Sequence, residues 1–201
     1  MVLLKVAQLG HPVLRQKATP VPPGRIGQPE LERLIADMVE TLREYDGVGL
    51  AAPQVHHSLQ LIVIEAIGER AGRGDIPLTV LINPRIVEAS EEMVTDWEGC
   101  LSAGELQGLV PRARRVVVEA LDRRGQPLTV TAEDFFARVL QHEIDHLEAI
   151  LLIDRMPDLR SLTFAREFAR YWVARPEAEP GRPDPAAAAP CVDESDVGGL
   201  Y

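Results

Sequence analysis

The stretch LQHEIDHLEA, residues 140–149, places the strongest constraint on how this chain can fold. Two stripes of residues run along it and its flanks at helical spacing. One stripe consists of Leu140, Ile144, Leu147 and Leu151, and the other of Phe135, Val139, His142 and His146. A helix that is apolar on two faces is buried, so we expect it at the centre of the domain. TAED at residues 131–134 has the form of a capping box, which predicts Thr131 as the N-cap.

The same helix carries two of the chain's five histidines, His142 and His146, on one face and one turn apart. Glu143 lies about 100° round the helix from His142. This His-Glu-x-x-His pattern supplies two nitrogen ligands for a metal ion and a general base for a water molecule. The alternative is one exposed histidine and one that is hydrogen-bonded in the core, but the complete pattern favours the metal site.

A catalytic centre of this kind needs a third protein ligand, and the sequence offers three. Cys100 in WEGCLS would add a thiolate, a sound partner for two imidazoles around a borderline-soft divalent metal. Glu167 in LTFAREFARYW would instead make the protein a zinc protease. Cys191 together with Cys100 would close a structural site without catalysis. The residues alone leave these alternatives open.

A loop of small residues, DGVGLAAPQ at 46–54, follows an amphipathic helix that we expect to begin near Pro29 and to end before Gly47. Its glycines and alanines allow the backbone to approach a ligand closely. Gln54 ends the loop with an amide that can donate to a developing oxyanion. The alternative is a plain connection between a helix and a strand.

Strand-like runs at residues 59–66, 78–89, 114–122 and 127–130 surround these motifs. We therefore expect an α+β fold, with antiparallel β-sheets packed around the central metal-binding helix, an N-terminal helix and a C-terminal helix. With 201 residues, 46% of them apolar, the chain has material for one domain, expected over residues 1–175. Residues 176–201 are rich in Pro, Ala, Gly and acids, which predicts a disordered tail.

Composition excludes several classes of function. The net charge of −10 argues against a nucleic-acid-binding protein, and no apolar run is long enough to span a membrane. Only two cysteines are present and nothing resembles a secretion signal, so we expect a reducing, cytoplasmic compartment.

GVGLAAPQ, EGCLS and QHEIDH, in this order and at this spacing, resemble the three signature motifs of the peptide deformylase family. LGHPVLRQKATPV, LVPR, LDRRGQP and IDRM resemble the intervening segments, so the resemblance covers roughly residues 1–172. It implies a bacterial-type, metal-dependent hydrolase that removes the formyl group from the N-terminal methionine of new proteins and releases formate. Nascent formyl-methionyl chains, met near the ribosome, would be its substrates.

The resemblance also implies a role for each matching residue. The metal ligands would be Cys100, His142 and His146, holding one Fe²⁺ for which Zn²⁺, Ni²⁺ or Co²⁺ can substitute. Glu143 would transfer protons, and the Gln54 side chain with the Leu101 backbone N–H would form the oxyanion hole. The backbone that binds the substrate as an added strand would come from Val48, Gly49 and Gly99.

Two departures from the family pattern stand near the site. Many members have Ile or Val followed by Pro where this chain has Ala103-Gly104, and many have Gly in place of Ala149. We expect the first to reshape the edge of the substrate cleft and the second to change how the central helix ends. We also expect Glu98 to pair with Arg112 and hold the cysteine loop.

The expected C-terminal helix carries four arginines that are spaced along its length. They are Arg160, Arg166, Arg170 and Arg175. They would form a basic patch that contacts the ribosome, or else a solvated helix face.

Overall fold

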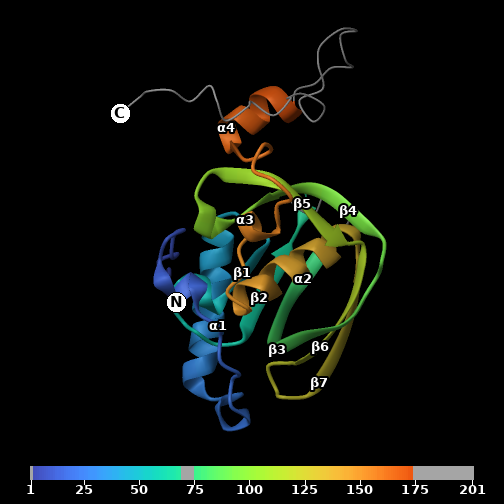
Figure 1. Ribbon diagram of the computed structural model, residues 1–201. Helices are drawn as coiled ribbons and strands as arrows, with labels where there is room; N and C mark the ends of the chain where they lie inside the picture. Colours follow the sequence, from blue (N-terminus) through green and yellow to red (C-terminus); the bar gives the residue numbers. More distant parts are fainter. Residues whose placement is uncertain (1, 69–74, 174–201) are drawn as a thin grey trace, which may run out of the picture.

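The computed structural model describes residues 2–68 and 75–173. In this part of the chain, two antiparallel sheets enclose one helix (Figure 1). The larger sheet has the order β1-β2-β3-β6-β7 and contains β1 (Gly49–Ala51), β2 (Leu61–Ala66), β3 (Ile76–Ala89), β6 (Arg115–Leu121) and β7 (Pro127–Glu133). The smaller sheet contains β4 (Met93–Gly99), β5 (Leu106–Ala113) and β8 (Thr163–Phe164), in that order. The expected α+β class is confirmed.

The central helix α2 (Asp134–Leu147) packs against strands of both sheets. Its Ala137 and Leu140 are fully buried, and His146 is only 1% exposed. The expectation of a buried helix is confirmed, and the two histidines face the interior of the protein.

The larger sheet is covered on both faces, which explains why β2 is almost wholly apolar. Ile62 and Ile64 point into the core that α2 completes. Leu61 and Val63 point the other way, into a second core formed with the N-terminal helix α1 (Pro29–Glu44). Successive residues of a strand face opposite sides, so one short strand contributes to both cores.

Both ends of α1 lie where the sequence predicted them. Pro29 occupies the first helical position, where its missing N–H costs no hydrogen bond. Beyond the other end, the Gly47 N–H donates to the Leu42 carbonyl at 2.9 Å and turns the chain toward β1.

The start of α2 differs from the prediction. Thr131 is not an N-cap but pairs with Val117 in the β6–β7 ladder, and the helix begins only at Asp134. The pairing with β6 outweighs the local capping signal, since backbone groups that are paired in a ladder need no side-chain cap. The β4–β5 hairpin was not among the expected strands.

A short helix α3 (Leu152–Arg155) follows α2, and the chain ends its described part in α4 (Ala165–Phe168) and a π-helical turn, η6 (Ala169–Val173). A C-terminal helix is therefore present, but it begins only at Ala165: Arg160, which was expected on it, lies in a turn before β8. The expected domain limit at residue 175, the expected tail and Cys191 lie outside the described residues. Over residues 2–68 and 75–173, no helix is both long and apolar enough to cross a membrane.

Candidate metal centre and active site

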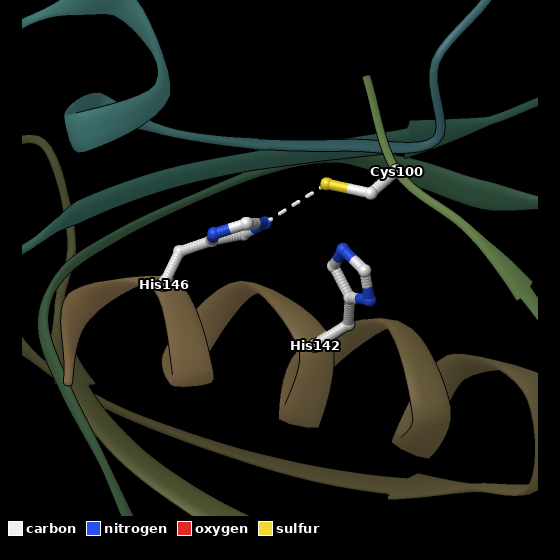
Figure 2. A group of neighbouring side chains, drawn as sticks. All are labelled: Cys100, His142 and His146. Carbon is white, nitrogen blue, oxygen red and sulfur yellow. Dashed lines mark hydrogen bonds between the residues drawn. The ribbon is translucent and has the colours of Figure 1, made fainter. Parts of the chain in front are cut away.

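Three side chains from two distant segments meet beside α2 (Figure 2). Cys100 follows the last residue of β4, while His142 and His146 project from successive turns of α2. One ligand atom from each residue lies within 4.8 Å of the others, and Cys100 Sγ is 3.3 Å from His146 Nε2. Glu167 does not belong to this group and pairs with Arg166 at 3.4 Å. The geometry thus favours Cys100 over Glu167 as the third ligand.

The cluster suits a divalent metal ion. One sulfur and two imidazole nitrogens form a donor set for a borderline-soft metal, and three protein ligands leave a position open for a reacting molecule. One buried atom at the site, Glu143 Oε2, has no hydrogen-bond partner among the described residues. Because buried polar atoms are normally paired, this oxygen is available to a polar molecule in the cavity.

Burial and neighbouring charges shift the pKa values of these groups. Burial alone would raise the pKa of the Cys100 thiol, but His146 and His142 beside it lower that pKa well below its usual range, which favours the metal-binding thiolate. Burial would lower the pKa of His142, but its hydrogen bonds with Cys100 and Glu98 raise it. Burial raises the pKa of Glu143 to about 7, although both histidines oppose the shift.

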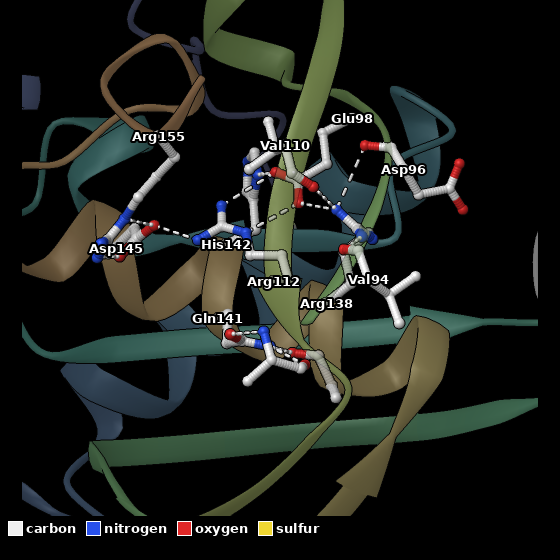
Figure 3. A network of polar contacts seen from close by, with 12 residues as sticks. Val94, Asp96, Glu98, Val110, Arg112, Arg138, Gln141, His142, Asp145 and Arg155 are labelled. Carbon is white, nitrogen blue, oxygen red and sulfur yellow. Dashed lines mark hydrogen bonds and ion pairs between the residues drawn. The ribbon is translucent and has the colours of Figure 1, made fainter. Parts of the chain in front are cut away.

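A buried carboxylate, Glu98, orients His142 (Figure 3). Its Oε2 lies 2.9 Å from His142 Nδ1, which leaves the other ring nitrogen to face the cluster. Arg112 Nε donates to Glu98 Oε1 at 2.9 Å, so the predicted pair is confirmed. Burial alone would raise the pKa of Glu98, but its bonds to His142 and Arg112 lower it to about 2. Glu98 therefore stays ionised and holds the cysteine segment next to the helix.

The same network extends to both ends of α2. Arg112 also pairs with Asp145, which accepts two further hydrogen bonds from Arg155 at 3.0 and 2.6 Å. Arg138 donates to Glu98 at 2.8 Å and to the Val110 carbonyl at 2.7 Å. Sequence reasoning missed Arg138 because an arginine in a helix is usually exposed. Its spacing was the available signal, since it lies four residues before His142 on the same face.

Gln54 lies next to Cys100, in the short helix η3 (Ala52–Val55). Its Oε1 accepts a hydrogen bond from the Ala51 N–H at 2.8 Å, and its Nε2 donates to Ser102 Oγ at 3.2 Å and approaches Cys100 Sγ at 3.6 Å. The amide is therefore fixed with its donor side toward the cysteine.

The N-terminal segment ties the two loops of the site together. Ala7 N donates to the Gln54 carbonyl at 2.7 Å and Leu9 N to the Ser102 carbonyl at 2.6 Å. The Gln8 side chain reaches the Leu101 carbonyl at 3.1 Å. This gives a structural reason for the segment around LGHPVL.

The residues of the candidate site line one cavity of about 390 Å³. Its lining contains eight of the nine residues singled out from the sequence, the exception being the more deeply buried His146: Val48, Gly49, Gln54, Gly99, Cys100, Leu101, His142 and Glu143. Each of β1 and β4, which border it, pairs with one neighbouring strand and stands at the edge of its sheet. Such an edge can accept an extended peptide.

Gly49 lies against the Glu143 side chain. A Cβ added there would come within 2.7 Å of Glu143 Cδ, closer than side chains tolerate. Any larger residue at position 49 would therefore displace the carboxylate.

The two departures from the family pattern both lie where the backbone has a positive φ. Gly104 has φ 61° and ψ −127°, a conformation that proline cannot adopt, and it lines the cavity. That Ala103-Gly104 reshapes the edge of the cleft remains a prediction. Ala149 follows α2 with φ 63°, in the left-handed region that favours glycine.

A cysteine and two histidines around a buried carboxylate, with a fixed amide donor in the same cleft, define a metal-dependent hydrolase. A family model described as polypeptide deformylase matches residues 3–161. Peptide deformylase 1 of Nitrosomonas europaea is 42% identical over 161 residues, which are 79% of this chain and 90% of the relative. The peptide deformylase of Desulfotalea psychrophila is 38% identical over 175 residues, 87% of this chain and 100% of the relative.

Solved structures agree with these relatives. The class I type b peptide deformylase of Acinetobacter baumannii with Met-Ala-Ser bound gives a TM-score of 0.74 at 36% identity, over 77% of this chain and 99% of that one. The peptide deformylase of Thermotoga maritima gives 0.70 at 37% identity, over 79% and 100%. This chain belongs to the polypeptide deformylase family, whose members are metal-dependent hydrolases that remove the N-formyl group.

Proposed function

We propose that this site removes the formyl group from the N-terminal methionine of newly made proteins, with Cys100, His142 and His146 as the ligands of one divalent metal ion and Glu143 as the group that moves the proton. One observation carries the proposal. Residue Glu143 is only 3% exposed, and it lines the same cavity as Cys100, His142 and Gln54.

A divalent metal held by these ligands would lower the pKa of a water molecule and polarise the formyl oxygen. We propose Fe²⁺ as the native ion, with Zn²⁺, Ni²⁺ or Co²⁺ able to take its place. A thiolate and two imidazoles can ligate all four ions, and geometry, ligand type and metal availability together set which one is bound.

Glu143 accepts the proton of the attacking water and then delivers it to the amine that leaves. A pKa of about 7, raised by burial, suits a group that must both take and give a proton near neutral pH. Gln54 Nε2 and the Leu101 backbone N–H donate to the oxygen on which negative charge develops. The hydrogen bond from Ala51 N to Gln54 Oε1 fixes the amide before the reaction starts.

The substrate peptide lies as an added strand between the edges of β1 and β4, with backbone from Val48, Gly49 and Gly99 as its partners. Support comes from the two free strand edges that border the cavity and from the relative whose structure holds Met-Ala-Ser. The enzyme would act in the cytoplasm, where formylated chains are made.

Acidic neighbours offset two of the arginines that were expected to meet the ribosome. Of the four arginines expected to form a basic patch, Arg160 lies 3.8 Å from Asp158 and Arg166 lies 3.4 Å from Glu167. These neighbouring acids reduce the positive charge of that face, and Arg175 lies outside the described residues.

Replacing Glu143 by Gln tests the proposal. The metal should stay near one ion per chain, because Glu143 is not a ligand, while formate release from formyl-Met-Ala-Ser should slow by about 10²–10⁴-fold. Acetyl-Met-Ala-Ser, which carries an extra methyl group, is the matched substrate control and should resist the wild-type enzyme. Loss of metal would make Glu143 a ligand, and full turnover would show that the proton moves elsewhere.

A further inference from the structure

Three aromatic side chains pack together next to the cleft. The Trp97 ring of β4 lies 4.7 Å from the Phe168 ring of α4 and 4.9 Å from the Trp172 ring of η6, measured between ring centroids. Both of these partners lie beyond residues 3–161, the part that matches the family model. The cluster therefore joins a segment outside the family match to the strand that leads into Cys100.

Trp97 lines the cavity that also contains Cys100 and Glu143. It lies two residues before Gly99, so both residues face the same side of β4. A strand rises about 3.3 Å per residue, which places Trp97 roughly 10 Å along β4 from Cys100.

That distance defines which part of a substrate Trp97 meets. A formyl-methionyl peptide that adds to the edge of β4, with its formyl group at Cys100, advances at the same rise per residue. Its third residue then lies beside Trp97, since side chains on neighbouring strands contact each other across one face of a sheet. This step rests on the proposed function.

We propose that Trp97 selects the third residue of the substrate and favours a large apolar or aromatic side chain there. Phe168 and Trp172 are positioning residues, because they hold the indole ring through edge and tilted contacts rather than lining the cavity themselves. Aromatic pairs of this kind are favourable, and a half-buried indole offers an apolar surface to a third ring.

The test compares kcat/KM for formyl-Met-Ala-Phe with that for formyl-Met-Ala-Ser. The ratio of these two values cancels a general loss of activity, and formyl-Met-Ala, which ends before Trp97, measures that general loss separately. We expect kcat/KM to be about tenfold higher for the Phe peptide. A closed pocket would give a larger ratio, but Trp97 is only half-buried. In Trp97→Ala the preference should fall to near one, and Trp97→Phe should restore most of it.

Trp172→Ala removes one of the rings that hold Trp97 while leaving Trp97 itself in place. It should reduce the preference for Phe by a smaller factor than Trp97→Ala does. Tyr171→Ala is the matched control, because Tyr171 is 48% exposed in the same turn and packs on Arg170 instead. An equal rate for both peptides in the wild type, or a preference that survives Trp97→Ala, would overturn the inference. Absence of formate release from every formyl-Met peptide would instead overturn the proposed function.

Discussion

Replacing Gly49 by Ala should disable the enzyme by moving a single carboxylate. Gly49 has no side chain where β1 passes Glu143, and a Cβ built on it lies 2.7 Å from both Glu143 Cδ and Cγ. Ordinary van der Waals contact begins at about 3.4 Å, so one of the two groups must yield. The backbone of Gly49 is held in the β1–β2 ladder opposite Ile64, and the side chain of Glu143 therefore moves.

The size of that movement sets the expected effect. Restoring contact distance requires a shift of roughly 1 Å, and a misplacement of that size in a catalytic group costs about 10²-fold in rate. We expect kcat to fall by this factor while KM changes little, since the carboxylate acts in proton transfer rather than in binding. The metal content should stay near one ion per chain.

The assay is formate release from formyl-Met-Ala-Ser by four proteins: wild type, Gly49→Ala, Glu143→Gln and the double variant. When Gly49→Ala is added to Glu143→Gln, kcat should fall little further, because the side chain that the methyl group displaces no longer moves a proton. Gly24→Ala is the control, as a Cβ there meets nothing within 4 Å.

Two results would refute this reasoning. A Gly49→Ala enzyme with unchanged kcat would show that the Glu143 position is not critical. A loss of the same size in the Gln background, or a loss confined to KM, would show that the methyl group blocks the substrate instead.

Three further changes test other parts of the structure. Cys100→Ala should lose most of its metal, because two imidazoles alone bind loosely, whereas Glu167→Ala should keep it; elemental analysis of the purified variants separates the ligands. Ala149→Gly should raise the free energy of unfolding in urea by about 1 kcal/mol, because Ala149 has φ 63°, and an unchanged or lower value contradicts the assignment of strain. Arg138→Met should lower that free energy by about 3 kcal/mol, because Glu98 and several carbonyls lose a buried donor, and a loss under 1 kcal/mol would show that Arg112 suffices.

Local patterns in the sequence determined the elements that carry most of the site. Helical periodicity places His142, Glu143 and His146 on one buried stretch of α2, and the structure has them there. The run at residues 59–66 indicated a strand, and the structure has β2 there, covered by α1 on one face and α2 on the other. Such patterns are readable because the repeat of a helix or strand is a property of the backbone itself.

Only the tertiary structure decided which distant groups meet α2. From the sequence, Cys100, Glu167 and Cys191 were all possible ligands. The β4–β5 hairpin was not recognised, because β4 is largely exposed and lacks a clear apolar alternation. Its pairing brings Cys100 and Glu98 beside His142, across more than forty positions of the chain. The same kind of pairing draws Thr131 into β7 rather than into a helix cap. Contacts of this kind depend on how whole sheets pack. The free energy of each pairing is shared among strands that lie far apart in the sequence, so no local repeat encodes it.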